Sequence, residues 1–180
     1  MTAESEAYEI IHWNKMYILD LNTLQIDYDD DLGNKPELQR TTEQLWVDYL
    51  IVRMRPETVI QKQIAEIFRL DNILDYKDTE VPLSENEFHK SLGCFHLYMS
   101  ENEDVEITDM TLSIVVTAYP RELFKYLDET LCCSVDERYP GVFVVTGYMV
   151  PIQILHTEKL SEEENLWLWN LNRNLTKYLN

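Results

Sequence analysis

Residues 45–52 read LWVDYLIV and residues 72–77 read NILDYK, and both segments predict strands at the centre of the fold. The first is a continuous apolar run broken by one carboxylate, Asp48, which is typical of a strand buried on both faces of a sheet. The second predicts another strand, and alternate side chains of a strand leave opposite faces. We therefore expect Asp75 and Lys77 to lie on the same face, as near neighbours.

Helical and extended patterns alternate along the rest of the chain. A serine followed three residues later by a glutamate, at residues 84–87 and 161–164, is a capping box that starts a helix. Pro120 opens another helix, and Pro140-Gly141 is a turn signal before further strands. The patterns predict helices over residues 58–70, 84–99, 120–131 and 162–179, and strands over residues 111–118, 141–150 and 151–157. This order of elements predicts an α/β fold.

The size and composition of the chain suit a single domain over residues 1–180. The chain has 180 residues, and 45% of them are hydrophobic, which is enough to close a core. Its four isolated glycines exclude the glycine-rich loops that cradle nucleotide phosphates. Residues 27–36 are rich in aspartate, which predicts a solvated acidic loop. They do not form an EF-hand, because the glycine and glutamate that this motif requires are not at their positions.

The charge of the chain is strongly negative and unevenly distributed. Its 33 acidic and 15 basic residues give a formal net charge of −18, which excludes a broad basic surface for phosphate backbones. Residues 48–77 are an exception, because they hold five acids and five bases. We expect DNA to bind locally there, with Arg53, Arg55 and Arg69 as candidate contacts.

The sequence also predicts a cytoplasmic protein with no membrane segment. No stretch approaches the roughly 18 to 20 consecutive apolar residues of a membrane span. The first ten residues carry acids where a secretory signal carries Lys or Arg. The three cysteines are an odd number and show no CxxC spacing, so we expect reduced thiols.

Asp48 needs a partner, because an isolated carboxylate is costly to bury in so apolar a strand. If its strand lies beside residues 72–77, Asp48, Asp75 and Lys77 can meet at one end of the sheet. Two carboxylates suit Mg²⁺ or Mn²⁺, and a lysine can orient the attacking water in phosphodiester hydrolysis. Plainer alternatives remain for both parts of this site. Asp48 caps a loop at the end of its strand or pairs with Arg53 or Arg55, and Asp75 and Lys77 form a surface ion pair.

An acid on one strand followed by D-Y-K on the next resembles the PD-(D/E)XK nuclease superfamily. The flanking segments are similar, in the same order, to those of a bacterial group of transposase-like or recombination-promoting nucleases, and the similarity covers roughly residues 9–172. The segments that carry it are LWVDYLIVR, EIFRLDNILDYKD, PLSENEFHKSLGCFHLYMS, YPRELF, YPGVFVVTG, PIQILHT and LSEEENLWLWNL.

The resemblance implies a restriction-endonuclease-like core, in which a mixed central β-sheet is flanked by helices. It implies metal ligation by Asp48 and Asp75 and a catalytic role for Lys77, with Mg²⁺ or Mn²⁺ as cofactor and DNA as substrate. The resemblance implies three auxiliary residues. Lys90 matches a basic position on the helix after the catalytic strand, and Tyr98 matches an aromatic position on the same helix. Glu9 matches an acid that related nucleases carry on a helix.

The sequence departs from the family pattern in ways that leave a second function open. Asp75 stands where the relatives usually carry Glu, and the relatives continue past the position of Asn180, so we expect a shortened or degenerate member. The alternative function is a catalytically inactive acidic module that binds proteins, and an acidic mimic of DNA ranks last. The helix over residues 162–179 is apolar nearly all round at its start, which predicts either burial within the domain or homodimerisation.

Overall fold

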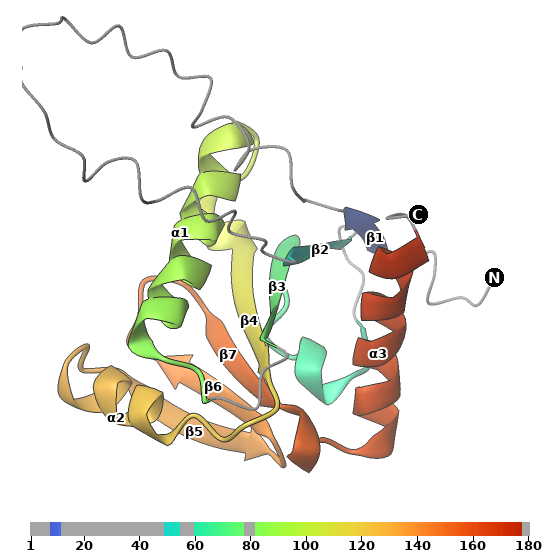
Figure 1. The fold of residues 1–180 in the computed structure, drawn as a ribbon. Helices are drawn as coiled ribbons and strands as arrows, with labels where there is room; N and C mark the ends of the chain where they lie inside the picture. The colour runs from blue at the N-terminus through green and yellow to red at the C-terminus, as the bar shows by residue number, and fades with distance from the viewer. Residues whose placement is uncertain (1–7, 12–48, 55–59, 78–81, 178–180) are drawn as a thin grey trace, which may run out of the picture.

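Seven strands of the described chain form one mixed sheet, with helices packed against it (Figure 1). The computed structural model describes residues 8–11, 49–54, 60–77 and 82–177, and the side chains of residues 49–54, 60–77 and 82–169. The strands are β1 (Tyr8–Ile11), β2 (Tyr49–Met54), β3 (Asp71–Lys77), β4 (Met110–Val116), β5 (Ser134–Tyr139), β6 (Val142–Thr146) and β7 (Ile152–His156). The helices are α1 (Glu85–Glu101), α2 (Arg121–Glu129) and α3 (Glu162–Lys177).

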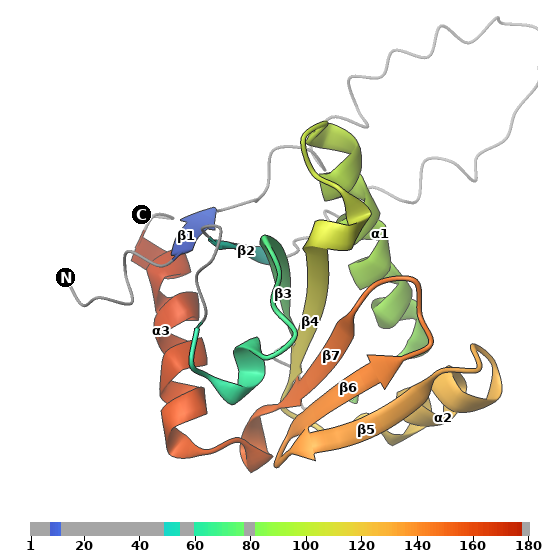
Figure 2. The same ribbon diagram turned by 180° about the vertical axis from the view of Figure 1, so that it is seen from behind.

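The strands lie in the order β1-β2-β3-β4-β7-β6-β5. Strands β1, β2 and β3 pair antiparallel, β3, β4 and β7 pair parallel, and β7, β6 and β5 pair antiparallel. Helices α1 and α2 lie on one face of the sheet and α3 lies on the other (Figures 1 and 2). The predicted α/β fold with a mixed central sheet flanked by helices is therefore confirmed.

Alternation along the central strands builds a core on each face of the sheet. Ile73 of β3 packs on the α1 face with Phe88 and Phe95 of that helix. Leu74, the next residue, packs on the α3 face with Trp167. Because each central strand is covered on both sides, its residues are apolar on both faces, as in buried parallel sheets.

Both predicted capping boxes start a helix where expected. Ser84 accepts a hydrogen bond from the backbone N–H of Glu87 (3.3 Å), and α1 begins at Glu85. Ser161 accepts one from the backbone N–H of Glu164 (3.3 Å), and α3 begins at Glu162. A serine hydroxyl satisfies one of the free N–H groups at the helix start, which explains why these boundaries could be predicted locally.

The prediction of a helix over residues 58–70 is wrong for residues 60–70, which are the ones that the structure describes. Residues 60–70 contain only the 3₁₀ turn Gln63–Ala65. The buried carboxylate of Glu164 accepts the N–H groups of the turn's first two residues (3.1 and 3.4 Å), and Gln153 donates to the carbonyl of Ile64 (2.6 Å). These distant side chains bind backbone groups that an α-helix would have paired internally, and the β-branched isoleucines favour helix only weakly.

Two strands at the sheet edges were not predicted. Strand β5 has the sequence SVDERY, and most of its side chains are exposed, so it lacks the apolar alternation that identifies a strand. It is held by antiparallel pairing to β6, across a turn in which Gly141 has φ +79°. Strand β1 pairs only with β2 among the described strands. The acidic segment 27–36 lies outside the described residues.

Helix α3 divides its apolar side chains between the core and the surface. Trp167 and Leu168 are buried, whereas Leu166 is 53% exposed and Trp169 is 55% exposed. Packing within the domain therefore accounts for only part of the apolar start of this helix. No described helix is long and apolar enough to cross a membrane.

Candidate active site

Two charged side chains form a site at the carboxyl end of β3. Asp75 is fully buried, and the ammonium Nζ of Lys77 lies 3.0 Å from Asp75 Oδ2. The adjacency predicted from strand alternation is confirmed. The alternative of a surface ion pair is wrong, because the carboxylate lies in the core.

Helix α1 contributes a third polar group. The hydroxyl of Ser91, itself fully buried, donates to Asp75 Oδ2 and lies 3.0 Å from the carbonyl oxygen of Glu87 one turn earlier. Ser91 faces the sheet because it lies one turn after Phe88 and one before Phe95, which are both in the core. Sequence reasoning missed Ser91, although its helical spacing from the apolar stripe was a usable signal.

The two oxygens of Asp75 have different surroundings. Oδ2 contacts Lys77 and Ser91, whereas Oδ1 has no hydrogen-bond partner among the described residues. Burial raises the pKa of Asp75 above its usual value, although Lys77 and Ser91 oppose that shift. A buried oxygen without a partner is costly unless a proton or a cation satisfies it. Carboxylate oxygen is a preferred ligand type of Mg²⁺ and Mn²⁺, so Oδ1 is the atom of this cluster that has the chemistry of a metal ligand.

Tyr49 of β2 lies directly opposite Asp75 in the antiparallel pairing. It is buried, and its hydroxyl donates to the carbonyl oxygen of Lys90 at 3.5 Å. Burial and the nearby Asp75 carboxylate raise the pKa of Tyr49, so this phenol stays protonated. Burial likewise raises the pKa of the Cys94 thiol in α1, which leaves it a poor nucleophile.

Asp48 and Arg55 lie outside the described residues, so the meeting of all three predicted catalytic groups stays a prediction. The chain position of Asp48 is directly before Tyr49, the residue that pairs with Asp75. Within the described side chains, no three His, Cys, Asp or Glu residues are grouped so that they could hold a metal ion. The structure therefore brings together two of the three predicted groups, Asp75 and Lys77, and adds Ser91 beside them.

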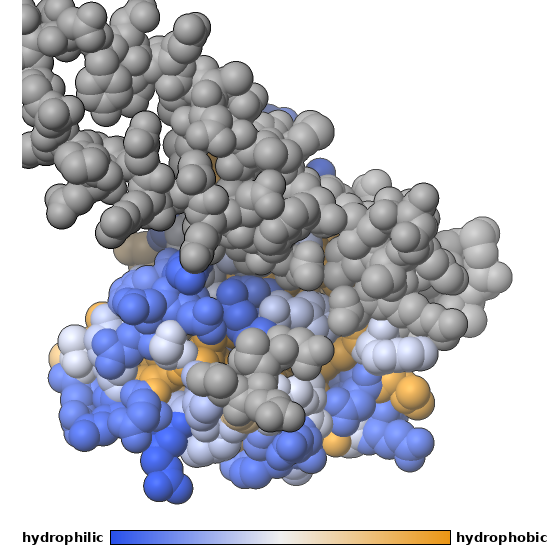
Figure 3. All heavy atoms as spheres, viewed as in Figure 1, coloured by the Kyte–Doolittle hydropathy of each residue, from blue (hydrophilic) through white to orange (hydrophobic). Residues whose placement is uncertain are grey.

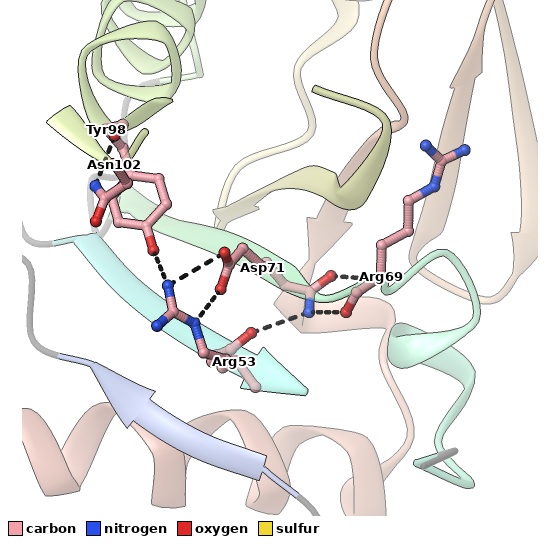
Figure 4. Close-up of polar contacts among 7 residues, drawn as sticks. Arg53, Arg69, Asp71, Tyr98 and Asn102 are labelled. Atoms are coloured by element: carbon pink, nitrogen blue, oxygen red, sulfur yellow. Dashed lines mark hydrogen bonds and ion pairs between the residues drawn. The ribbon is translucent and has the colours of Figure 1, made fainter. Parts of the chain in front are cut away.

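Arg53 belongs to a separate cluster at the amino end of β3 (Figure 4). Its guanidinium donates to both carboxylate oxygens of Asp71, at 2.7 and 3.3 Å, and to the hydroxyl of Tyr98 at 3.0 Å. Hydrogen bonding to Asp71 raises the pKa of Arg53, which therefore stays charged. Asp71 is thus the described partner of Arg53.

The structure places Tyr98 and Glu9 where the auxiliary roles implied for them do not fit. Four strand residues, or about 13 Å at roughly 3.3 Å each, separate Asp71 and Asp75, so the Tyr98 hydroxyl belongs to the opposite end of β3. Glu9 lies in strand β1, paired with Arg53, whereas a helical acid was expected. The resemblance matched these residues by order along the chain, which carries no information on sheet register.

The remaining basic candidates lie on the surface. Lys90 is exposed on α1, next to Ser91 in sequence. Arg69 is exposed before β3, and its guanidinium donates to the carbonyl oxygen of Thr108. The backbone around Arg69 is fixed by Asn72, whose amide exchanges two hydrogen bonds of 2.7 Å with it. Lys90 is thus an exposed base directly before Ser91, which contacts Asp75.

Comparison of this chain with family models, with curated proteins and with solved structures gives no match. The arrangement of Asp75, Lys77 and Ser91 is therefore interpreted from its own geometry.

Proposed function

We propose that this chain is a metal-dependent DNA endonuclease with a PD-(D/E)XK arrangement in a restriction-endonuclease-like core. The observation that carries the proposal is the buried Asp75 carboxylate, which has one oxygen beside the Lys77 ammonium and the other without a described partner. The mixed sheet between helices supports the same proposal, because it is the architecture that the sequence resemblance implies.

Each residue of the site has a distinct proposed role. Asp75 Oδ1 and the carboxylate of Asp48 would hold Mg²⁺ or Mn²⁺, which when bound supplies positive charge at the scissile phosphate and makes water more acidic. Lys77 would orient the attacking water and stabilise the negative charge that develops on the phosphate. Ser91 fixes the rotamer of Asp75 through Oδ2, which leaves Oδ1 available.

The test is cleavage of supercoiled plasmid DNA with Mg²⁺ or Mn²⁺. We expect nicked and linear products from the parent chain, and a loss of at least 100-fold in rate for Lys77→Ala and Asp75→Asn, within the usual range for a catalytic group. Lys125→Ala is the matched control, because its amine is exposed and pairs only weakly with Glu129, at 3.9 Å. A folded parent chain that cuts nothing with either ion, or a Lys77→Ala variant that cuts normally, contradicts the proposal.

The exposed apolar residues of α3 support a second candidate function, a non-catalytic acidic module that binds protein. Leu166 and Trp169 are more than half exposed, and much of the described surface is hydrophilic (Figure 3). Homodimerisation through α3 is the simplest form of this alternative. It predicts a molecular mass in sedimentation that rises with protein concentration, together with no heat of Mg²⁺ binding in calorimetry.

A further inference from the structure

A pocket of about 790 Å³ opens at the carboxyl ends of β3 and β4, on the α3 face of the sheet. Val115 and Leu160 contribute apolar surface to it, Leu166 and Trp169 line it from α3, and Lys77 and Glu162 are its charged members. This volume is within the range of about 300 to 1,000 Å³ found for small-molecule sites. Ligands of α/β sheets commonly bind outside the carboxyl ends of the strands, where this pocket lies.

Hydrogen bonds fix the walls of the pocket in place. The Tyr76 hydroxyl donates to the carbonyl of Leu168 (2.9 Å), which ties β3 to α3. The Asn165 amide donates to the carbonyls of Thr157 and Leu160 (3.1 Å each), which ties the first turns of α3 to the end of β7. Leu168 is buried on the core side of the helix, and Trp169, the next residue, lines the pocket. The pocket is therefore preformed.

We propose that this pocket receives one unpaired nucleobase of the nucleic-acid substrate, stacked on the indole of Trp169. This inference rests on the proposed nuclease function, because Lys77 lines the pocket and also contacts Asp75. Asp75 lies on the α1 face of the sheet, so a base in the pocket would bring its strand to the shared sheet edge, where the Lys77 amine reaches the Asp75 carboxylate. Stacking of bases on aromatic side chains is a common means of holding single strands.

The charge of the protein favours a base over a phosphate as the occupant. A net charge of −18 repels the nucleic-acid backbone, whereas a nucleobase is neutral and presents flat apolar faces. The carboxylate of Glu162 can accept a hydrogen bond from an exocyclic amino group, such as N4 of cytosine. Thymine has no such group, so the pocket is expected to prefer cytosine to thymine.

Binding of fluorescein-labelled (dC)₁₂ and (dT)₁₂, measured by anisotropy in EDTA so that no cleavage occurs, tests this inference. Loss of one stacked base costs about 1 to 3 kcal/mol, so we expect Trp169→Ala to weaken (dC)₁₂ binding by about 5- to 150-fold. Trp169→Phe is expected to restore most of the affinity, and Glu162→Gln to reduce the preference for (dC)₁₂. Met149→Ala, at a residue 71% exposed that does not line the pocket, is the control and should bind as the parent does.

The outcomes separate this inference from the proposed function. If the parent chain cleaves plasmid DNA but Trp169→Ala binds (dC)₁₂ as the parent does, the proposed base-binding role of the pocket is wrong. The proposed nuclease function then still stands. If Trp169→Ala loses (dC)₁₂ binding and the parent chain cleaves no plasmid DNA, the pocket is supported as a base-binding site. The proposed nuclease function is then wrong. A dimer in sedimentation that Trp169→Ala dissociates also overturns the pocket, because a second copy then covers it.

Discussion

The Asp75–Lys77 pair provides the sharpest test of how this site is built. In a Lys77→Ala variant, the carboxylate of Asp75 loses its ammonium partner but stays in the core, with Ser91 as its remaining described hydrogen-bond donor. Removing one partner of a buried ion pair costs about 3 to 5 kcal/mol, because the other charge is left uncompensated. Domains are stable by about 5 to 15 kcal/mol, so the variant is expected to fold.

The size of the loss follows from the surroundings of each partner. Lys77 is only 14% exposed and Asp75 is not exposed at all, so solvent screens the pair weakly. For a chain of this length, a loss of 3 to 5 kcal/mol corresponds to a fall in Tm of about 6 to 20 °C. The Lys125→Ala control, at an amine 61% exposed, is expected to change stability by no more than about 0.5 kcal/mol.

The pH dependence of this loss has a definite sign. Burial raises the pKa of folded Asp75 above the ordinary value of 3.8, so its contribution to stability is greatest below that pH and is lost as pH rises through the folded pKa. Without Lys77 the folded pKa rises further, and the stability difference between parent and variant therefore grows with pH. The growth is limited to about 1.4 kcal/mol per pH unit.

The assay is urea unfolding followed by tryptophan fluorescence at pH 5 and pH 8, for the parent chain, Lys77→Ala, Asp75→Asn and the double variant. We expect Lys77→Ala to be costly in the parent background and nearly neutral in the Asp75→Asn background, most clearly at pH 8. Equal losses in the two backgrounds, or a larger loss at pH 5, would refute the argument that an uncompensated buried carboxylate causes the effect.

Three further predictions concern the metal, the second charged cluster and a turn. In differential scanning calorimetry, millimolar Mg²⁺ is expected to raise the Tm of the parent chain but not that of Asp75→Asn, because an ion that binds the folded state stabilises that state. Equal shifts in Tm would show that the ion binds elsewhere. Arg53→Ala is expected to lower the free energy of unfolding by about 1 to 3 kcal/mol in urea titrations, since it leaves the buried Asp71 uncompensated. Gly141→Ala is expected to lower the free energy of unfolding by at least about 1 kcal/mol, because φ is +79° and the new Cβ would lie 2.7 Å from the carbonyl oxygen of His156. An unchanged midpoint in urea would show that the turn relaxes.

Part of the candidate site was predictable because it depends on local geometry. Two residues apart on a strand, Asp75 and Lys77 must leave the same face, whichever strands lie beside them. Their contact at 3.0 Å follows from that constraint. The other groups come from elsewhere in the chain, because Ser91 is on α1 and Tyr49 on β2. No local pattern specifies which helix or strand packs against β3.

Sequence order was a poor guide to position within the sheet. Tyr98 was an auxiliary candidate for the active site and Arg53 a candidate DNA contact, and both belong to the Asp71 cluster at the opposite end of β3. The register of β2 against β3 pairs Arg53 with Asp71 and Tyr49 with Asp75, and a shift of register would exchange these neighbours. Register depends on pairing between strands about twenty residues apart, so it was not available from either segment alone.

Three features follow from the order of amino acids alone: the α/β class, both serine caps and the shared face of Asp75 and Lys77. These features depend on the periods of the helix and strand and on hydrogen bonds within a single turn. Three other features became visible only in the folded chain. Glu164 stabilises a 3₁₀ turn 100 residues earlier in the chain, the polar segment SVDERY forms an edge strand, and Asp75 is buried beside Ser91. These outcomes depend on which groups the folded chain brings together, because a buried polar group must find its partner wherever packing places one.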